Sequence, residues 1–188
     1  MFIAEPTDRL TSSSLLNLNR RQTRTVIGAY PLYRWVVLNC ADEAVRKQQE
    51  YSAEPVYYYL FGHRGVASFT EIFGGGDRDF GVCHADELQY LFPVGDGLFP
   101  DRKPSSDDKQ VAELLTTMWA NFARTGNPTP ELNNIVKEKW KPATPRHMEY
   151  YYFKANKSNM RSGLYLKRAK LWRHITSSDS CKDIKDEL

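Results

Sequence analysis

Residues 55–61 read Pro-Val-Tyr-Tyr-Tyr-Leu-Phe, and this unbroken apolar and aromatic run constrains the fold more than any other feature of the sequence. A strand with one face in water alternates polar and apolar side chains, whereas a strand covered on both faces does not. Doubly covered strands are typical of mainly parallel sheets with helices on each side. The sequence therefore predicts an α/β fold in which this run is a buried strand.

The clearest helix is predicted over residues 107–124. Its apolar side chains recur three and four positions apart, as on the core-facing side of an amphipathic helix. They are Val111, Leu114, Leu115, Met118, Trp119 and Phe122. Ser and Asp residues can cap the amino end, and the Gly126-Asn127-Pro128 stretch ends the helix. We expect this apolar stripe to pack in the core and not to hold a cofactor.

Residues 31–50 allow two interpretations. The Trp-Val-Val-Leu stretch at residues 35–38 is locally strand-like. Pro31, however, can occupy a first helical position, and residues 41–49 favour a helix by composition. We predict a helix here.

Shorter elements are predicted around these two helices. A short helix is expected whose first turn holds Asp86 and Glu87, because the helix dipole favours acidic side chains there, and the apolar patch at residues 88–93 follows them. A short strand is expected over residues 148–153. A final amphipathic helix is expected over residues 161–175, with Leu164, Leu171 and Ile175 on one face.

Two stretches are predicted to be loops. Gly74-Gly75-Gly76-Asp77 lacks the spacing and the trailing Lys-Ser/Thr of a phosphate-binding loop, so we interpret it as an open connection. Residues 95–106 are rich in Pro, Gly and Asp. Residues 1–25 are polar and show no clear period, which predicts a loose start to the chain.

Composition excludes several classes of protein. A formal charge of +3 over 188 residues is too small to indicate a polyanion partner. Residues 135–175 carry eleven Lys and Arg against two Glu, but no nucleic-acid-binding motif accompanies them, so we expect a solvated basic face. No apolar run approaches the roughly 18 residues of a membrane-spanning helix. Three cysteines without a Cys-x-x-Cys pair predict neither a disulfide framework nor a zinc site.

His84 is the residue best placed for chemistry. It lies in Gly-Val-Cys-His-Ala-Asp-Glu-Leu at residues 81–88, after a glycine-containing loop and before a predicted helix. A histidine on such a loop can reach into a cleft as a general base, but it can also be a partly buried structural residue. Metal ligation is less expected, because no second His or Cys stands at ligand spacing nearby.

Linked motifs resemble the type-B carboxylesterase and cholinesterase family, especially its insect esterases. The run at residues 55–61, with His63-Arg64 after it, is similar to the strand before that family's catalytic-histidine loop. Residues 81–92 resemble the histidine motif itself. Residues 118–128 resemble the family's late helix and its exit, and Trp140 and Pro142 follow as its Trp-x-Pro stretch. The resemblance covers residues 26–175.

The resemblance implies the C-terminal portion of an α/β-hydrolase fold, namely the last sheet strands with their packing helices, incomplete as it stands. His84 matches the histidine of a Ser–acid–His triad, which activates a serine and then water in ester hydrolysis. A Gly-x-Ser-x-Gly nucleophile elbow is absent, and in Gly65-Val66-Ala67-Ser68 the serine comes one position late. We therefore expect the isolated chain to be inactive. The resemblance implies a small-molecule ester substrate for the complete enzyme and no cofactor or metal.

An alternative from a different class is a non-catalytic interaction module, since the same family includes adhesion members with dead triads. A basic nucleic-acid binder ranks last, and its affinity would have to fall steeply with salt. Retention of a full histidine motif favours the esterase interpretation.

The last four residues, Lys185-Asp186-Glu187-Leu188, form an endoplasmic-reticulum retention signal. The first residues lack the basic and apolar regions of a signal peptide. The two ends therefore allow two interpretations: either a signal peptide lies upstream, and we then expect the lumen of the endoplasmic reticulum with the KDEL receptor as partner, or the retention signal is a relic. Asn156-Lys157-Ser158 matches the sequon for N-glycosylation, with Asn156 as the acceptor. The expected organisation is a loose segment at 1–25, the esterase-like part at 26–175 and a tail at 176–188.

Overall fold

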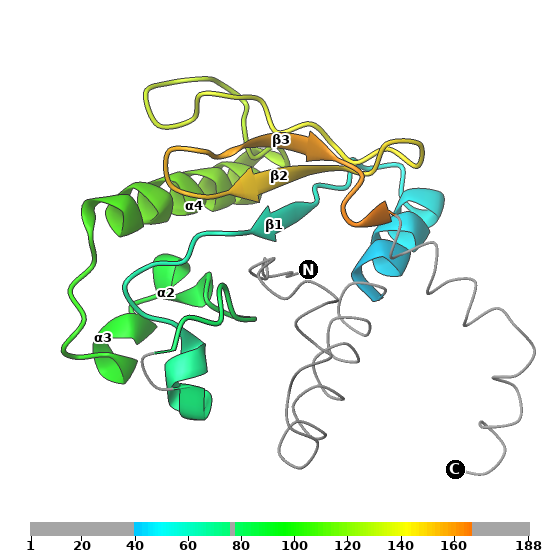
Figure 1. Cartoon of the computed structure of the whole chain (residues 1–188). Coiled ribbons are helices and arrows are strands. Elements are labelled where there is room, and N and C mark those ends of the chain that lie inside the picture. The colour runs from blue at the N-terminus through cyan, green and yellow to red at the C-terminus, as the bar shows by residue number, and fades with distance from the viewer. Residues whose placement is uncertain (1–39, 76–77, 167–188) are drawn as a thin grey trace, which may run out of the picture.

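The computed structural model describes residues 40–75 and 78–166, and Figure 1 shows their arrangement. A helix at residues 40–51 comes first, where a helix is predicted, and the strand-like residues 35–38 lie outside the described part. The elements that follow are β1 (Tyr59–Phe61), the π-helix η1 (Glu71–Gly75), α2 (Leu88–Leu91), α3 (Val94–Leu98), α4 (Ser106–Thr125), β2 (Glu149–Phe153) and β3 (Asn159–Ser162). Residues 1–25 also lie outside the described part.

The three strands form one mixed sheet in the order β1-β2-β3. β1 and β2 are parallel, with Tyr59 opposite Tyr151 and Phe61 opposite Phe153. β2 and β3 are antiparallel and pair from Glu149 opposite Ser162 onwards. The predicted strands at 55–61 and 148–153 are thus confirmed, although the first is three residues long.

Both faces of this sheet are covered, which is why the strand run does not alternate. One face packs on the helix at residues 40–51 through Ala41 and Val45. The other face packs on the apolar stripe of α4. On the first face lie Tyr58, Leu60, Tyr150 and Tyr152, and on the second Tyr59, Phe61, Tyr151 and Phe153. Side chains point alternately to the two faces along a strand, so a doubly covered strand is apolar at every position.

Helix α4 agrees with its sequence pattern at both ends. The Ser105 side chain accepts a hydrogen bond from the Asp108 backbone N–H, and the Asp108 side chain accepts one from the Ser105 N–H, which completes a capping box. At the other end Gly126 takes a left-handed φ of 72°. The predicted stripe is buried except for Trp119, which is partly buried, and Phe122, which is 48% exposed.

Three predictions about connections are wrong. Helix α3, at residues 94–98, overlaps the start of the predicted loop at 95–106. The glycine stretch at residues 74–77 is predicted to be an open loop, but Gly74 and Gly75 are the last residues of η1. Residues 76–77 lie outside the described part. Arg161 and Ser162 belong to β3, not to a final helix, because they pair with β2.

Leu164 is buried in the core as predicted, but it follows Gly163 in a turn and not in a helix. Gly163 has a φ of 69°, which interrupts any helix at this point. Leu171 and Ile175 lie outside the described residues.

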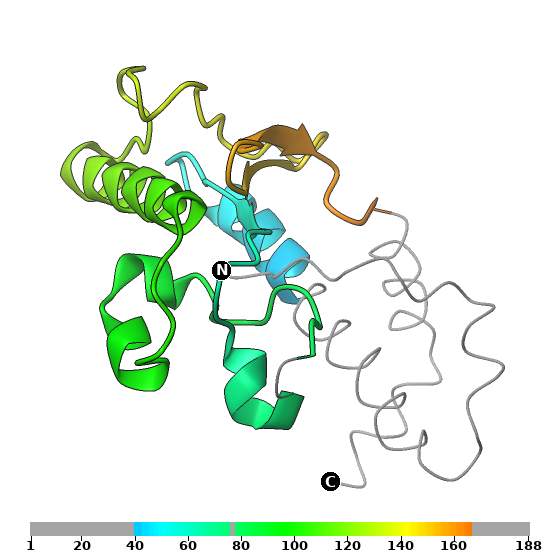
Figure 2. The ribbon, with the colours of Figure 1, turned by 60° about the vertical axis from the view of Figure 1, so that its left-hand side comes forward.

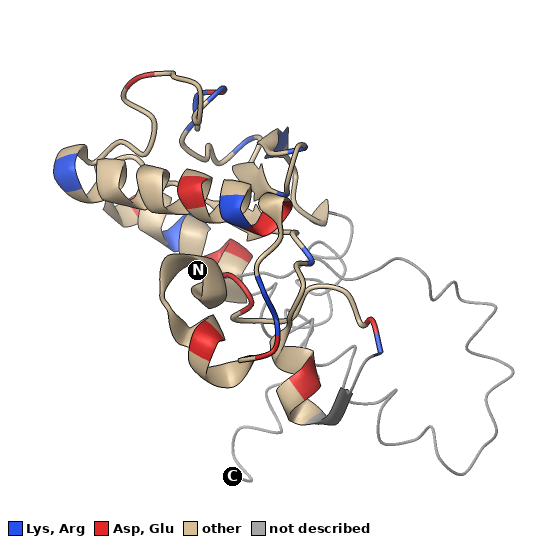
Figure 3. Cartoon of the chain, turned by 90° about the vertical axis from the view of Figure 1, so that its left-hand side faces the viewer, with Lys and Arg blue, Asp and Glu red and all other residues tan. Residues whose placement is uncertain are grey.

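Helices α2 and α3 lie below the sheet and α4 in both ribbon views, on the side away from β3 (Figures 1 and 2). Lys and Arg are interspersed with Asp and Glu along α4 (Figure 3). In the described part of the chain, no helix is long and apolar enough to cross a membrane.

Candidate active-site turn

His84 lies in a tight turn at residues 83–86, shortly before α2. The Asp86 backbone N–H donates to the Cys83 carbonyl at 3.2 Å, which makes His84 and Ala85 the two central residues of a four-residue turn. Ala85 has a φ of 73°, and a positive φ at this position is characteristic of a type II turn. The imidazole of His84 belongs to an exposed residue at the outer corner of the turn.

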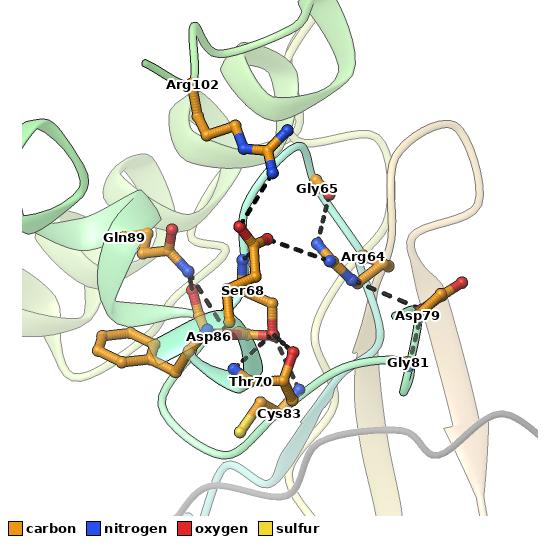
Figure 4. Close-up of polar contacts among 12 residues, drawn as sticks. Arg64, Gly65, Ser68, Thr70, Asp79, Gly81, Cys83, Asp86, Gln89 and Arg102 are labelled. Carbon is orange, nitrogen blue, oxygen red and sulfur yellow. Dashed lines mark hydrogen bonds and ion pairs between the residues drawn. The ribbon is translucent and has the colours of Figure 1, made fainter. Parts of the chain in front are cut away.

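The carboxylate of Asp86 fills the inside of this turn (Figure 4). Asp86 is only 2% exposed. Its Oδ2 accepts from the Cys83 N–H at 2.8 Å and from the Ser68 hydroxyl at 2.9 Å, and its Oδ1 accepts from the Phe69 N–H at 2.8 Å. The prediction of Asp86 and Glu87 in the first helical turn is wrong: α2 begins at Leu88, and Glu87 is its N-cap residue without a side-chain cap bond. The reason is that Asp86 bonds to the turn and to residues 68–69.

Ser68 lies in the segment that follows the carboxyl end of β1 and makes several further hydrogen bonds there. Its buried hydroxyl accepts from the Thr70 N–H and Thr70 hydroxyl at 3.2 and 3.0 Å. Its backbone N–H donates to Glu71 Oε1 at 3.1 Å. Glu71 in turn forms ion pairs with Arg64 at 3.5 Å and Arg102 at 3.2 Å. These contacts attach the His84 turn to the segment that leaves β1.

The Ser68 hydroxyl donates its proton in a hydrogen bond to the buried Asp86 carboxylate, so Ser68 is not arranged to act as a nucleophile. This agrees with the sequence, in which Ser68 stands one position late for a nucleophile elbow. Cys83 is a free thiol of intermediate exposure. Burial and the nearby negative charge of Asp86 raise the pKa of the Cys83 thiol, which keeps it protonated.

Burial also acts on the two acidic residues of the turn. It raises the pKa of Asp86 above the ordinary value, although the hydrogen bonds from Cys83, Phe69 and Ser68 oppose the shift. Burial, together with the negative charge of Asp86, raises the pKa of Glu87 to about 7. Glu87 therefore titrates near neutral pH.

A second buried aspartate was not singled out by the sequence. Asp108 Oδ1 lies 3.0 Å from His63 Nε2 and accepts the Tyr90 hydroxyl at 2.9 Å. Its Oδ2 accepts the Ser105 N–H at 2.8 Å and the Ser105 hydroxyl at 2.6 Å. Gly65 passes so close that a Cβ there would collide with the Tyr90 hydroxyl and the Asp108 carboxylate. The Ser-x-x-Asp spacing of a capping box was the one local signal for this cluster.

A cavity of about 270 Å³ lies among α2, α3 and the start of α4. Tyr90, Phe99 and Arg102 are among its lining residues, and His84 is not. The cavity therefore lies next to Asp108 and does not reach the His84 turn. Among the described residues, no group of three or more His, Cys, Asp or Glu side chains is arranged to hold a metal ion.

Asn156, the predicted glycosylation acceptor, lies in the exposed turn between β2 and β3 with a φ of 57°. Its side-chain Nδ2 donates to Asp107 Oδ1 at 3.3 Å. The predicted retention signal at residues 185–188 lies outside the described part of the chain.

The geometry at His84 suits proton transfer. An imidazole on a turn fixed at both ends and attached beyond a parallel strand can accept a proton from a nucleophile and return it to a leaving group. Catalytic groups of α/β proteins commonly lie beyond the carboxyl ends of the parallel strands. Among the described residues, no serine of a nucleophile elbow lies beside His84.

Comparison with known proteins gives a consistent result. Residues 11–172 match the Carboxylesterase family. The chain is 32% identical over 108 residues to a juvenile hormone esterase of Tribolium castaneum, which covers 55% of this chain and 16% of that protein. It is 29% identical over 117 residues to an acetylcholinesterase of Gallus gallus, which covers 62% of this chain and 14% of that protein. It is 29% identical over 112 residues to a venom carboxylesterase of Apis mellifera, which covers 59% of this chain and 18% of that protein. The matched part is thus less than a fifth of the length of each of these relatives.

Proposed function

The chain belongs to the carboxylesterase family, and from this premise we propose that it carries the triad histidine of a carboxylic ester hydrolase. This family has the α/β-hydrolase fold, and the described residues, with helices on both faces of a sheet, form part of such a fold. The observation that carries the proposal is the position of His84. It stands on a hydrogen-bonded turn attached beyond β1, within the part of the chain that matches the family.

In this proposal His84 acts as a general base and then as a general acid. It takes the proton of a serine hydroxyl while that oxygen attacks the ester carbonyl, and it returns the proton to the departing alcohol. It next takes a proton from water, which attacks the acyl-enzyme and releases the carboxylic acid. In this proposal the serine is supplied by polypeptide outside the 188 residues, because no Gly-x-Ser-x-Gly elbow occurs among them. The triad acid follows the serine and precedes the histidine in this fold, and the family resemblance puts it upstream of these residues as well.

It follows that the isolated chain has no ester turnover above background. In serine hydrolases the loss of one triad member costs on the order of 10⁴-fold in rate. The substrate class is a small carboxylic ester, the class of the two relatives that are named as a juvenile hormone esterase and an acetylcholinesterase.

A non-catalytic interaction module is the second candidate. It is favoured by the absence of a nucleophile elbow from these 188 residues. A module of this kind would have no use for a proton-transferring histidine at residue 84.

We also propose the lumen of the endoplasmic reticulum as the location, with the KDEL receptor as the partner of residues 185–188. The exposed Asn156 turn would then accept a glycan. Digestion with endoglycosidase H should shift the native protein in a gel, and an Asn156→Gln variant should not shift. An undigested band in the parent protein would contradict the lumenal location.

The deciding experiment captures the native product from its source tissue with an antibody to residues 176–188. The captured protein is treated with a fluorophosphonate probe, which labels activated serines, and assayed with a short-chain p-nitrophenyl ester. A labelled, active band heavier than 21.7 kDa supports the esterase. An unlabelled band at 21.7 kDa without activity contradicts it and favours the interaction module. A heat-denatured sample controls for labelling that does not depend on an activated serine.

A further inference from the structure

We infer that Asp86 is a positioning residue for His84, whose buried carboxylate fixes the turn that presents the imidazole. This inference rests on the proposed role of His84 as the triad histidine. Asp86 does not itself touch the reacting atoms; it acts through the backbone on either side of His84.

The first argument is the closure of the turn. Cys83 and Asp86 are bonded in both directions: the Asp86 N–H donates to the Cys83 carbonyl, and the Cys83 N–H donates to Asp86 Oδ2. The two residues that flank His84 and Ala85 are therefore held together at both ends of the turn. Few backbone rotations remain open to His84 while both hydrogen bonds are present.

The second argument is attachment to the sheet. The remaining strong acceptor positions of Asp86 take the Ser68 hydroxyl at 2.9 Å and the Phe69 N–H at 2.8 Å. Ser68 is fully buried, and its own backbone N–H is bonded to Glu71, which is paired with Arg64 and Arg102. The turn therefore has a fixed position relative to the segment that leaves β1, and so does the imidazole it carries.

The third argument is the strained backbone. Ala85 holds a φ of 73°, a conformation that costs a residue with a Cβ about 1 kcal/mol. Such a conformation persists only where surrounding contacts over-determine it. The four hydrogen bonds between Cys83, Asp86 and residues 68–69 supply those contacts.

Helix capping alone does not explain these bonds. Helix α2 is four residues long, and its N-cap residue Glu87 makes no side-chain cap bond. The short bonds of the Asp86 carboxylate all come from residues before α2; from within α2 it accepts a long bond of 3.5 Å from the Gln89 side chain and none from a backbone N–H. Asp86 therefore serves the turn and not the helix.

The test uses histidine-labelled 188-residue chain and reads the ring signals of His84 and His63 by NMR. Asp86→Asn keeps the size of the side chain but replaces one oxygen by an NH₂ group that cannot accept. Ser105→Ala is the matched control, because it removes a serine hydroxyl from the other buried aspartate, Asp108, which contacts His63.

We expect Asp86→Asn to move or split the His84 ring signals and to leave those of His63 in place. The amides of Cys83 and Phe69 should exchange with solvent about tenfold faster or more, since a buried hydrogen bond is lost. Ser105→Ala should do the reverse: His63 moves and His84 does not. A general loss of stability would instead affect the signals of both histidines in each variant.

An unmoved His84 signal in Asp86→Asn would overturn the inference. So would parallel movement of both histidines in both variants, because that reports loosening of the whole molecule. If Asp86→Asn does not fold, Ser68→Ala is measured by the same criterion, since it removes one of the three short bonds and leaves the two from backbone groups. None of these readouts requires ester hydrolysis, so failure here is distinct from a failure of fluorophosphonate labelling.

Discussion

Asp86 and Asp108 are both buried and both accept a serine hydroxyl, but their remaining donors differ in kind. Asp86 accepts two backbone N–H groups, one from Cys83 in the His84 turn and one from Phe69 at the start of the helical segment that leads into η1. Asp108 is in contact with two side chains from other parts of the fold, His63 after β1 and Tyr90 of α2, as well as with the start of its own helix. The first cluster therefore fixes the path of a loop, whereas the second fastens three elements of secondary structure together.

The two clusters also respond to pH in opposite directions. Burial alone would raise the pKa of Asp108, but the hydrogen bonds from His63, Ser105 and Tyr90 outweigh it and hold that pKa well below its usual range. Asp108 therefore contributes stability above the unfolded-state pKa of about 3.9, and this is lost as pH falls toward its folded-state pKa. Asp86 and Glu87 have raised pKa values, so the folded state binds protons more readily there and gains stability as pH falls.

The largest effect is expected from removing the imidazole of His84. In an esterase that supplies the serine and the acid, His84→Ala should lower turnover by about 10⁴-fold or more, because the serine loses its base. The free energy of unfolding should change by less than about 0.5 kcal/mol, because His84 is exposed. Rates are compared by p-nitrophenyl ester hydrolysis and stability by urea denaturation. Full activity in His84→Ala would mean that the histidine assignment is wrong.

Asp108→Asn tests the fastening role of the second cluster. It replaces a carboxylate oxygen that accepts hydrogen bonds by an NH₂ group among donors, which should cost about 3 kcal/mol of stability. Urea denaturation of the 188-residue chain measures the loss. Asp86→Asn should cost less, because it affects a loop. A larger loss for Asp86→Asn would reverse the comparison.

Glu87→Gln tests the opposite pH responses. In the parent chain, Glu87 should contribute a rise in stability of about 2.5 kcal/mol as pH falls from about 8 to about 5, because its pKa of about 7 exceeds its unfolded value of 4.5. Glu87→Gln should remove most of this rise and stabilise the chain at pH 8. Denaturation midpoints at several pH values give the result, and a variant that keeps the full rise would assign it to other groups.

Ser105→Ala should cost about 1 kcal/mol, the usual value of a helix cap, because it removes both the cap and a donor to Asp108. Ser106→Ala is the matched control on the neighbouring exposed residue and should change stability by less than about 0.5 kcal/mol. Thermal unfolding of the two variants distinguishes them. Equal losses would show that the capping box contributes little.

The smallest effect is expected at the strained residue of the His84 turn. Ala85→Gly should raise stability by about 0.5 kcal/mol, because glycine takes a φ of 73° without penalty and this outweighs its greater freedom in the unfolded chain. Ala123→Gly on the exposed side of α4 is the control of opposite sign and should cost about 1 kcal/mol. A loss of stability in Ala85→Gly would mean that the turn is not strained.

Several features were predictable because their signals are local. The unbroken run at residues 55–61 indicated a strand covered on both faces, and the spacing from Val111 to Met118 indicated the buried side of α4. The ends of that helix were predictable from Ser105 and Gly126 for the same reason. His84 was singled out by its loop and by the resemblance of residues 81–88 to a family motif.

The prediction failed where contacts between distant residues decided the outcome. Residues 161–162 have a helical pattern, yet they form β3 because β2 offers a strand edge with which they pair. Asp86 has the local signature of a first helical turn, yet it bonds across to residues 68 and 69.

By itself the sequence determined the doubly covered strand, the position and ends of α4, the family resemblance and the histidine that carries the proposed chemistry. Only the tertiary structure decided what holds that histidine and what fastens α4 to β1. The reason is physical: periodicity and caps depend on neighbours within one or two turns of chain. The long-range hydrogen bonds of Asp86 and Asp108, by contrast, join residues 17 to 45 positions apart, which only the packed fold brings to about 3 Å from each other.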